Sequence, residues 1–156
     1  MIREITAEVA ERAHEMLELM VEAKGVGLAA PQVGWSAQLC VINPTPEDRS
    51  REIVCVNPAL AEAEGEAVSE EGCLSFPELR GNIPRFARVT CRWYDLEGHR
   101  MEATAEGLLA RIFQHELDHL NGRLIIDRMT PASRLSARGR LKELERDFKT
   151  AQHSLV

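Results

Sequence analysis

The sequence lacks the features that would take a protein into a membrane, out of the cell or onto nucleic acid. No apolar run approaches the roughly 18 residues that a membrane span needs. The N-terminus carries acidic residues from its fourth position onward and no apolar segment of the signal-peptide type. The formal net charge is −6, without a pervasive basic stripe. We therefore expect a soluble, cytoplasmic protein whose main ligand is not nucleic acid.

Cysteines are few, and their spacing argues against a disulfide framework. The chain has four of them, with no CxxC pair and no leader segment that would favour oxidation. Cys40, Cys55 and Cys91 lie within hydrophobic alternation, which is typical of small core residues. Cys73 differs, because it lies in the glycine-containing turn EGCLSFP (71–77).

The residues that are present suffice for one globular domain. The chain has 156 residues, of which 44% are hydrophobic and 28% charged, and no internal repeat, low-complexity tract or linker is visible.

Apolar spacing predicts three helices. They are expected at residues 7–23, at about 106–121 and from 131 to about 149. Thr6 is placed to cap the start of the first helix, and Gly25 to end it. Thr130 and Pro131 form an N-cap followed by proline at the first helical position, which is a typical start for the third.

Four β-prone runs are predicted to form two strand pairs. They are AQLCVI (37–42), REIVCVN (51–57), ARVTCRWY (87–94) and HRMEAT (99–104). The first two are each closed by Asn-Pro, and the last two flank the turn DLEG. Residues 61–86 are rich in Gly, Glu and Pro without a clear period, so we expect irregular chain there with short strand pieces.

The stretch QHELDHLNG (114–122) places two histidines four residues apart on the second predicted helix. At this spacing His115 and His119 share a face and can converge on one ion. Glu116 would lie beside that ion, suited to taking a proton from metal-bound water. The alternative is an ordinary helix with partly exposed histidines, in which Glu116 and Asp118 are merely solvated. Five residues alone do not decide between the two.

A catalytic zinc-type site usually has three protein ligands and a water, so a third ligand is needed. Downstream of His119, the acidic residues fall mostly on the expected surface of the last helix, and none is compelling. Upstream, Cys73 stands apart from the other cysteines.

Three motifs, in order, resemble those of the peptide deformylases. They are GVGLAAPQ (25–32), EGCLS (71–75) and QHELDH (114–119). The segment from ARVTCRWY to DRM is similar to the family's hairpin, ligand helix and closing strand, the last over LIIDRM. The resemblance covers roughly residues 7 to 130, and the final helix fits the longer bacterial members.

Together with the expected elements, the resemblance implies one α+β domain over residues 1–156. Antiparallel or mixed β-sheets would pack around the central HExxH helix, with one helix near each end of the chain. Family members carry a longer segment before the first helix, so we expect differences at the sheet edge and the site entrance. Lys24 stands where members often have an acidic residue.

The implied activity is hydrolysis of the N-terminal formyl group of formyl-methionyl nascent polypeptides, which releases formate. By match to the motifs, Cys73, His115 and His119 would bind one divalent ion. That ion is ferrous iron in the family, and zinc, nickel or cobalt is commonly accepted. Such a ligand set leaves a fourth position for water, whose pKa a divalent ion lowers from 15.7 toward roughly 7.

Further roles follow from the resemblance. Glu116 would be the general base and acid, and Gln32 with the backbone N–H of Leu74 would stabilise the oxyanion. The candidates for binding substrate are Val26, Gly27, Leu28, Arg80, Arg111 and Ile112. Core packing is an equal alternative for Ile112, and plain solvent exposure for Arg80. Glu71 is expected to pair with Arg85 and hold the cysteine loop.

Other functions remain open from the sequence. One is a related metal amidase acting on another small N-acyl substrate. Another is a non-catalytic protein with a structural ion site, against which the intact Glu116 counts, because a closed structural site needs no base. We expect a monomer. For the basic run RLSARGRLK in the last helix, ribosome docking competes with a solvated charged face.

Overall fold

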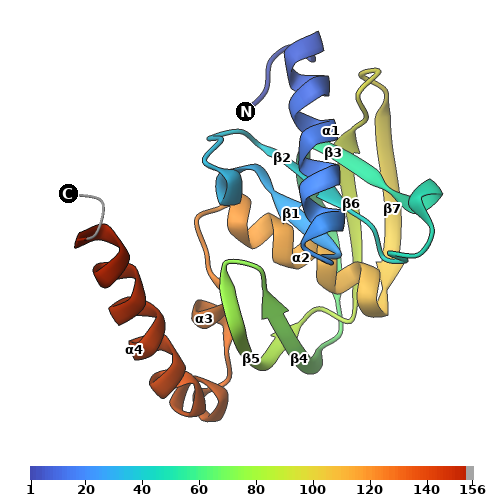
Figure 1. Cartoon of the computed structure of the whole chain (residues 1–156). Coiled ribbons are helices and arrows are strands. Elements are labelled where there is room, and N and C mark those ends of the chain that lie inside the picture. Colours follow the sequence, from blue (N-terminus) through green and yellow to red (C-terminus); the bar gives the residue numbers. More distant parts are fainter. Residues whose placement is uncertain (154–156) are drawn as a thin grey trace. The chain divides into compact units, whose positions relative to one another are not determined.

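The structure is a computed structural model that describes residues 1–153 in two compact units (Figure 1). The first unit comprises Met1–Ala67 and Arg85–Leu124; the second comprises Val68–Pro84 and the chain from Ile125 onward. Antiparallel strand pairs and helices near both ends confirm the predicted α+β class. Among the described helices, none combines the length and the hydropathy that crossing a membrane requires.

Five strands of the first unit form one antiparallel sheet in the order β1-β2-β3-β6-β7. They are β1 (Gly27–Ala29), β2 (Leu39–Ile42), β3 (Ile53–Glu64), β6 (Arg88–Tyr94) and β7 (Arg100–Glu106). Both predicted strand pairs are confirmed: β2 pairs with β3, with Cys40 opposite Cys55, and β6 with β7 form a hairpin.

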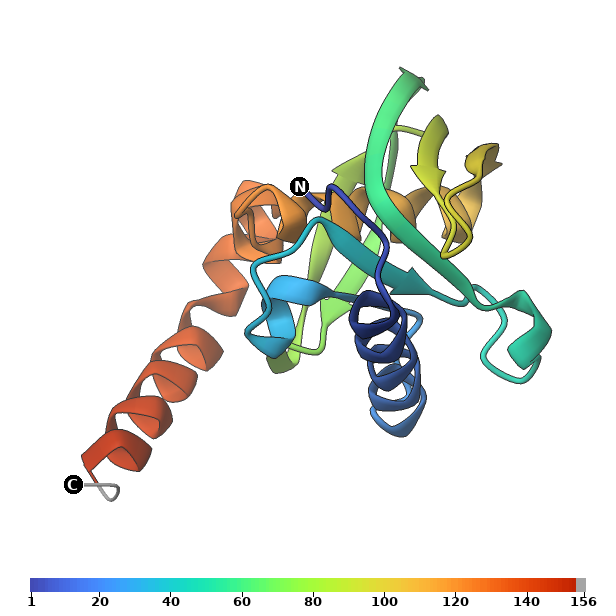
Figure 2. The same ribbon diagram turned by 90° about the horizontal axis from the view of Figure 1, so that it is seen from above.

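Helices α1 (Ala7–Glu22) and α2 (Gly107–Leu120) cover opposite faces of this sheet (Figure 2). Strand β2 shows why, because successive side chains point to opposite faces. Cys40 and Ile42 join the core cluster of α2, and Leu39 and Val41 join that of α1. A strand apolar on both faces therefore lies between two helices.

Helix α1 begins as predicted but ends differently. The backbone N–H of Val9 donates to the Thr6 hydroxyl at 3.4 Å. At the other end Lys24, one residue before the expected stop at Gly25, takes the left-handed conformation with φ of 55°. The N–H of Gly25 then donates to the Met20 carbonyl at 2.9 Å and closes the helix.

Strand β3 continues through Asn-Pro, where its end was predicted. Asn57 adopts φ of 50°, and the pairing with β6 shifts register between Val56 and Ala59. Pro58 has no N–H to donate, so it is accommodated at this bulge. The Asn57 side chain accepts the N–H of Ile2 at 2.9 Å and donates to the Ile2 carbonyl at 2.7 Å, which ties the start of the chain to the sheet.

The second unit corrects the prediction of irregular chain over residues 61–86. Besides the end of β3, this segment holds β4 (Ala67–Cys73) and β5 (Phe76–Arg85), which form a two-stranded sheet. In β5 the buried positions alternate regularly, at Leu79, Gly81, Ile83 and Arg85. The apolar alternation that predicts a strand was not visible in the sequence, because two of these four buried positions are glycine and arginine.

The segment LIIDRM forms a helix, α3 (Ile125–Arg128), so the expected closing strand is wrong. Ile125 and Met129 pack on the buried face of β5, a contact that one helical turn allows. The last helix, α4 (Pro131–His153), begins where predicted, and the N–H of Ser133 donates to the Thr130 hydroxyl at 3.3 Å.

Candidate metal centre and active site

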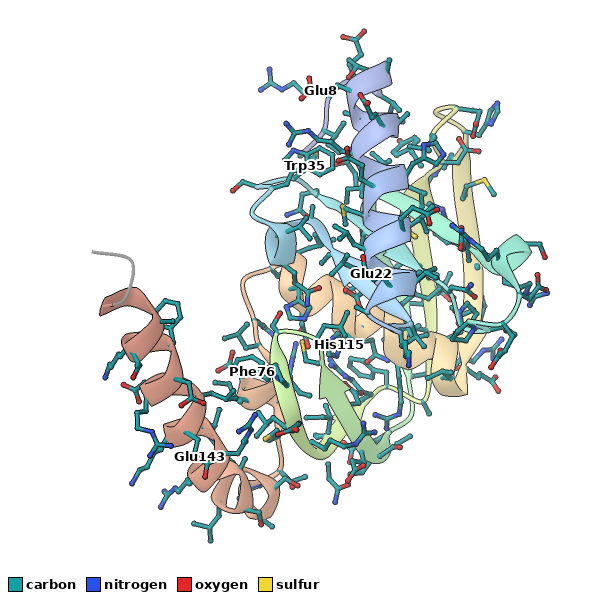
Figure 3. The ribbon with its side chains drawn as sticks, in the orientation of Figure 1. Glu8, Glu22, Trp35, Phe76, His115 and Glu143 are labelled. Carbon is teal, nitrogen blue, oxygen red and sulfur yellow. The ribbon has the colours of Figure 1, made fainter. Side chains whose placement is uncertain are left out.

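Helix α2 packs one face against the sheet and carries the HELDH residues at its C-terminal end. Ala110, Phe113 and Leu120 pack into the cluster against the sheet. His115, labelled in Figure 3, is half-buried, whereas Glu116 and His119 are 3% and 7% exposed. The alternative of an ordinary helix is therefore wrong in expecting Glu116 to be merely solvated.

The two imidazoles have the spacing of two ligands that share an ion. Nε2 of His115 and Nε2 of His119 lie 3.2 Å apart. Two nitrogens, each about 2.0–2.1 Å from one tetrahedral ion, would be about 3.3 Å apart. The donor set on α2 therefore fits a divalent metal without rearrangement.

Cys73 ends strand β4, where it is half-buried beside the apolar cluster of the second unit. Cys73 belongs to the second unit, whereas His115 and His119 belong to the first. The role of Cys73 as the third ligand stays a prediction, and one sulfur with two nitrogens is a donor set typical of zinc and of other transition metals.

Two of the other cysteines, Cys40 and Cys91, are poorly suited to binding a metal. A hydrogen bond with Cys55, reinforced by burial, raises the pKa of the Cys40 thiol well above its ordinary value. Burial raises the pKa of Cys91 to about 12. Cys40 and Cys91 are therefore neutral thiols at pH 7, while metal binding requires thiolate.

Gln32 lies in the short 3-10 helix η1 (Ala30–Val33), which ends at Gly34 in the left-handed conformation. Its side-chain oxygen accepts the N–H of Ala29 at 2.8 Å. This hydrogen bond fixes the amide plane and makes Nε2 the donating end, which an oxyanion requires. Leu74 follows β4 in a turn with its side chain exposed, so its expected contribution is through the main chain.

The residues expected to bind substrate lie in different environments. Val26 and Ile112 pack in the cluster between α2 and the sheet, and Leu28 lies in the cluster under α1. The Arg111 guanidinium donates to the Ala67 carbonyl at 2.6 Å, and Arg80 pairs with Glu70 at 2.6 Å. Their roles toward substrate stay predictions.

A buried ion pair on α2 was missed from the sequence. Arg85 donates to the Asp118 carboxylate at 2.5 Å, and the two residues are 5% and 8% exposed. Gln114, four residues before Asp118 on the same face, accepts the Phe86 N–H at 2.9 Å and donates to the Phe86 carbonyl at 3.0 Å. Together they fix the ligand helix to the chain that enters β6. The predicted pairing of Arg85 with Glu71 stays a prediction.

Comparison with known proteins identifies one family that most of the chain is similar to. The family model of polypeptide deformylases matches residues 1–135. A peptide deformylase of Endomicrobium trichonymphae is 43% identical over 90% of this chain and 83% of its own length. That of Thermodesulfovibrio yellowstonii is 42% identical over 90% of this chain and 86% of its own. A crystal structure of peptide deformylase from Plasmodium falciparum, 38% identical, superposes with a TM-score of 0.91 over 96% of this chain and 88% of that one.

Proposed function

This chain belongs to the peptide deformylase family, and on that premise we propose which of its residues carry out the reaction. It is a metal-dependent hydrolase that removes the N-terminal formyl group from formyl-methionyl polypeptides. The observation that carries the assignment of roles is the imidazole pair on α2, with its nitrogens 3.2 Å apart, beside the buried Glu116.

Cys73, His115 and His119 would hold the divalent ion, which when bound would supply a water acidified enough to attack at neutral pH. Glu116 follows a ligand on the same helix, so its carboxylate accepts the proton of the attacking water and passes it to the departing amine. The amine leaves only when protonated, so one carboxylate serves both steps.

The charge that develops on the formyl oxygen needs donors fixed in advance. Gln32, held by its hydrogen bond from Ala29, offers Nε2, and Leu74 offers its backbone N–H. Each such donor is worth about 3–4 kcal/mol in the transition state.

Replacement of Glu116 tests this assignment. Glu116→Ala should keep its metal and lose about 10²–10⁴-fold in turnover, because the base is removed while the ligands stay. Formate release from formyl-Met-Ala measures turnover, and elemental analysis measures the metal. Glu97→Ala, which changes an exposed carboxylate in the β6–β7 turn, is the control and should be fully active. Unchanged turnover in Glu116→Ala would remove Glu116 from the mechanism.

Substrate choice has a separate test. A site shaped for hydrogen on the acyl carbon should turn over formyl-Met-Ala faster than acetyl-Met-Ala, since the added methyl is disfavoured by about 1–3 kcal/mol or more where it clashes. Faster turnover of acetyl or longer acyl analogues would instead indicate a different N-acyl amidase.

We propose ferrous iron as the native ion, with zinc, nickel or cobalt able to replace it. A thiolate ligand beside iron is sensitive to peroxide, so purification without oxygen followed by metal analysis is the appropriate measurement. Iron present and activity lost on peroxide treatment would support this choice. Zinc alone, with activity that resists peroxide, would contradict it.

We further propose that the protein acts as a cytoplasmic monomer and docks on the ribosome through α4. Arg134, Arg138 and Lys142 are exposed at four-residue intervals, hence on one side of the helix. Phosphates would attract this stripe, so cosedimentation with ribosomes should weaken as salt rises. Cosedimentation that is absent, or indifferent to salt, would contradict docking.

A further inference from the structure

The backbone conformation at Gly27 does not explain why this residue is a glycine. It lies in β1, paired with Ile42, and its φ is outside the left-handed region that Gly34 occupies. Glycine inside a strand weakens the strand, so such a residue often marks a place where another group approaches closely.

The approaching group is the Glu116 carboxylate. A Cβ built on Gly27 would lie 2.2 Å from Oε1, 2.8 Å from Cδ and 3.0 Å from Cγ of Glu116. Real Cβ atoms essentially never lie under 3.0 Å from another heavy atom, so with a methyl group at Gly27 the Glu116 side chain must shift from its present conformation.

Neither partner can easily retreat from this contact. Glu116 is 3% exposed, so no open solvent lies behind its carboxylate. The C-terminal end of α2 is tied to the chain before β2, where the Gln38 side chain donates to the Leu120 carbonyl at 2.9 Å. On the strand side, Ala29 and Val26 pack into the same cluster as α2.

We propose that Gly27 is a positioning residue for Glu116: the side chain that Gly27 lacks leaves the space in which the catalytic carboxylate sits. The inference rests on the proposed role of Glu116 as the base. It differs from a contact between Gly27 and substrate, because Gly27 here acts through another residue.

The kinetic consequence is specific. In Gly27→Ala the carboxylate must move by about 1 Å, and a displacement of that size costs on the order of 10²-fold in rate. The loss should appear in kcat, with KM for formyl-Met-Ala within about twofold and the metal content unchanged, because the ligands are untouched. Gly139→Ala is the matched control, since its added methyl meets nothing within 4 Å, and it should keep the kcat of the parent.

A thermal double-mutant cycle tests the contact without using activity. The four proteins are the parent, Gly27→Ala, Glu116→Ala and the double variant. Gly27→Ala should lower the unfolding temperature in the parent and leave it nearly unchanged when Glu116 is already alanine. If Gly27→Ala alone does not fold, folding of the double variant supports the same conclusion.

Two results would overturn the inference. One is that Gly27→Ala lowers the unfolding temperature equally in the parent and in Glu116→Ala, and a double variant that does not fold counts as this result. The other is an unchanged kcat in Gly27→Ala. A parent that releases no formate would overturn the proposed function instead. The thermal cycle would still report whether Gly27 and Glu116 share this space.

Discussion

At the scale of single residues, the four thiols differ in what surrounds them. Cys40, Cys55 and Cys91 are at most 1% exposed, whereas Cys73 is half-buried. With the metal removed, one thiol per chain should therefore react quickly with an aromatic disulfide reagent in the native protein, and four in denaturant. Cys73→Ser should abolish the fast reaction, and two or more fast thiols in the native protein would contradict this division.

Burial of Cys91 predicts a dependence of stability on pH. Folding raises the pKa of this thiol from 9.0 to about 12, so the unfolded chain loses the proton first as pH rises. The stabilisation is fully present below pH 9 and is lost between pH 9 and about 12. Urea unfolding from about pH 8 to about pH 10.5 should show a shallower decline in Cys91→Ala than in the parent. Identical slopes would contradict the shifted pKa.

The buried pair of Arg85 and Asp118 predicts a large loss of stability. In Arg85→Ala the Asp118 carboxylate stays buried without this cation, which costs about 3–5 kcal/mol of unfolding free energy. Arg88→Ala is the control, because its pair with Glu64 at 3.1 Å is on the surface and such pairs are worth about 0–1 kcal/mol. Urea unfolding measures both, and equal losses would show that burial of the pair is not decisive.

Residue spacing predicted those parts of the site that are local in sequence. His115 and His119 were paired by helical geometry, and Cys73 was singled out because it alone lay outside hydrophobic alternation. Asp118 was given no partner and was considered only as a solvated residue of the alternative helix, because its partner Arg85 is 33 positions away and on another element. The reason for Gly27 was hidden in the same way, since the Glu116 contact joins a strand to a helix distant in sequence.

At the scale of elements, the C-terminal end of α1 holds a residue whose backbone conformation lowers the stability of the protein. Lys24 holds φ of 55°, a conformation that costs a residue with a side chain about 1–2 kcal/mol and glycine much less. Lys24→Gly should therefore raise the unfolding free energy by about 1 kcal/mol, measured in urea. Ala23→Gly is the control, because Ala23 is in the right-handed region with φ of −76° and should gain nothing. A loss of stability in Lys24→Gly would mean that the lysine side chain contributes more than its backbone costs.

Elements were predicted well wherever one period dominated the sequence. Helices α1, α2 and α4 and the β6–β7 hairpin lie close to their expected bounds. Strand β5 was missed because Gly81 occupies one of its buried positions, where a Cβ would meet Met129 at 2.8 Å. Tertiary packing thus selected a small residue and removed the apolar signal that a sequence pattern depends on.

At the scale of the whole molecule, the expected elements and the family resemblance predicted the class of fold, but the order of its strands was not predicted. Strand β3 pairs with β6, although β4 and β5 lie between them in the chain. The second compact unit is likewise assembled from residues 68–84 and the chain from Ile125 onward. Such pairings join segments distant in sequence, and no local period records them.

The same scale carries a prediction about metal removal. An ion that binds only the folded protein stabilises it by mass action, by about 4 kcal/mol when free metal is at 1,000 times its Kd. Chelation should therefore lower the unfolding temperature of the parent, measured by calorimetry with metal analysis before and after. His119→Ala should remove this response, because one of the proposed ligands is gone, whereas His14→Ala on the exposed side of α1 should keep it. Chelation could instead strip the metal and leave the unfolding temperature unchanged. The ion would then bind the folded and unfolded chains equally well. That result would contradict a site defined by the imidazole pair that folding forms on α2.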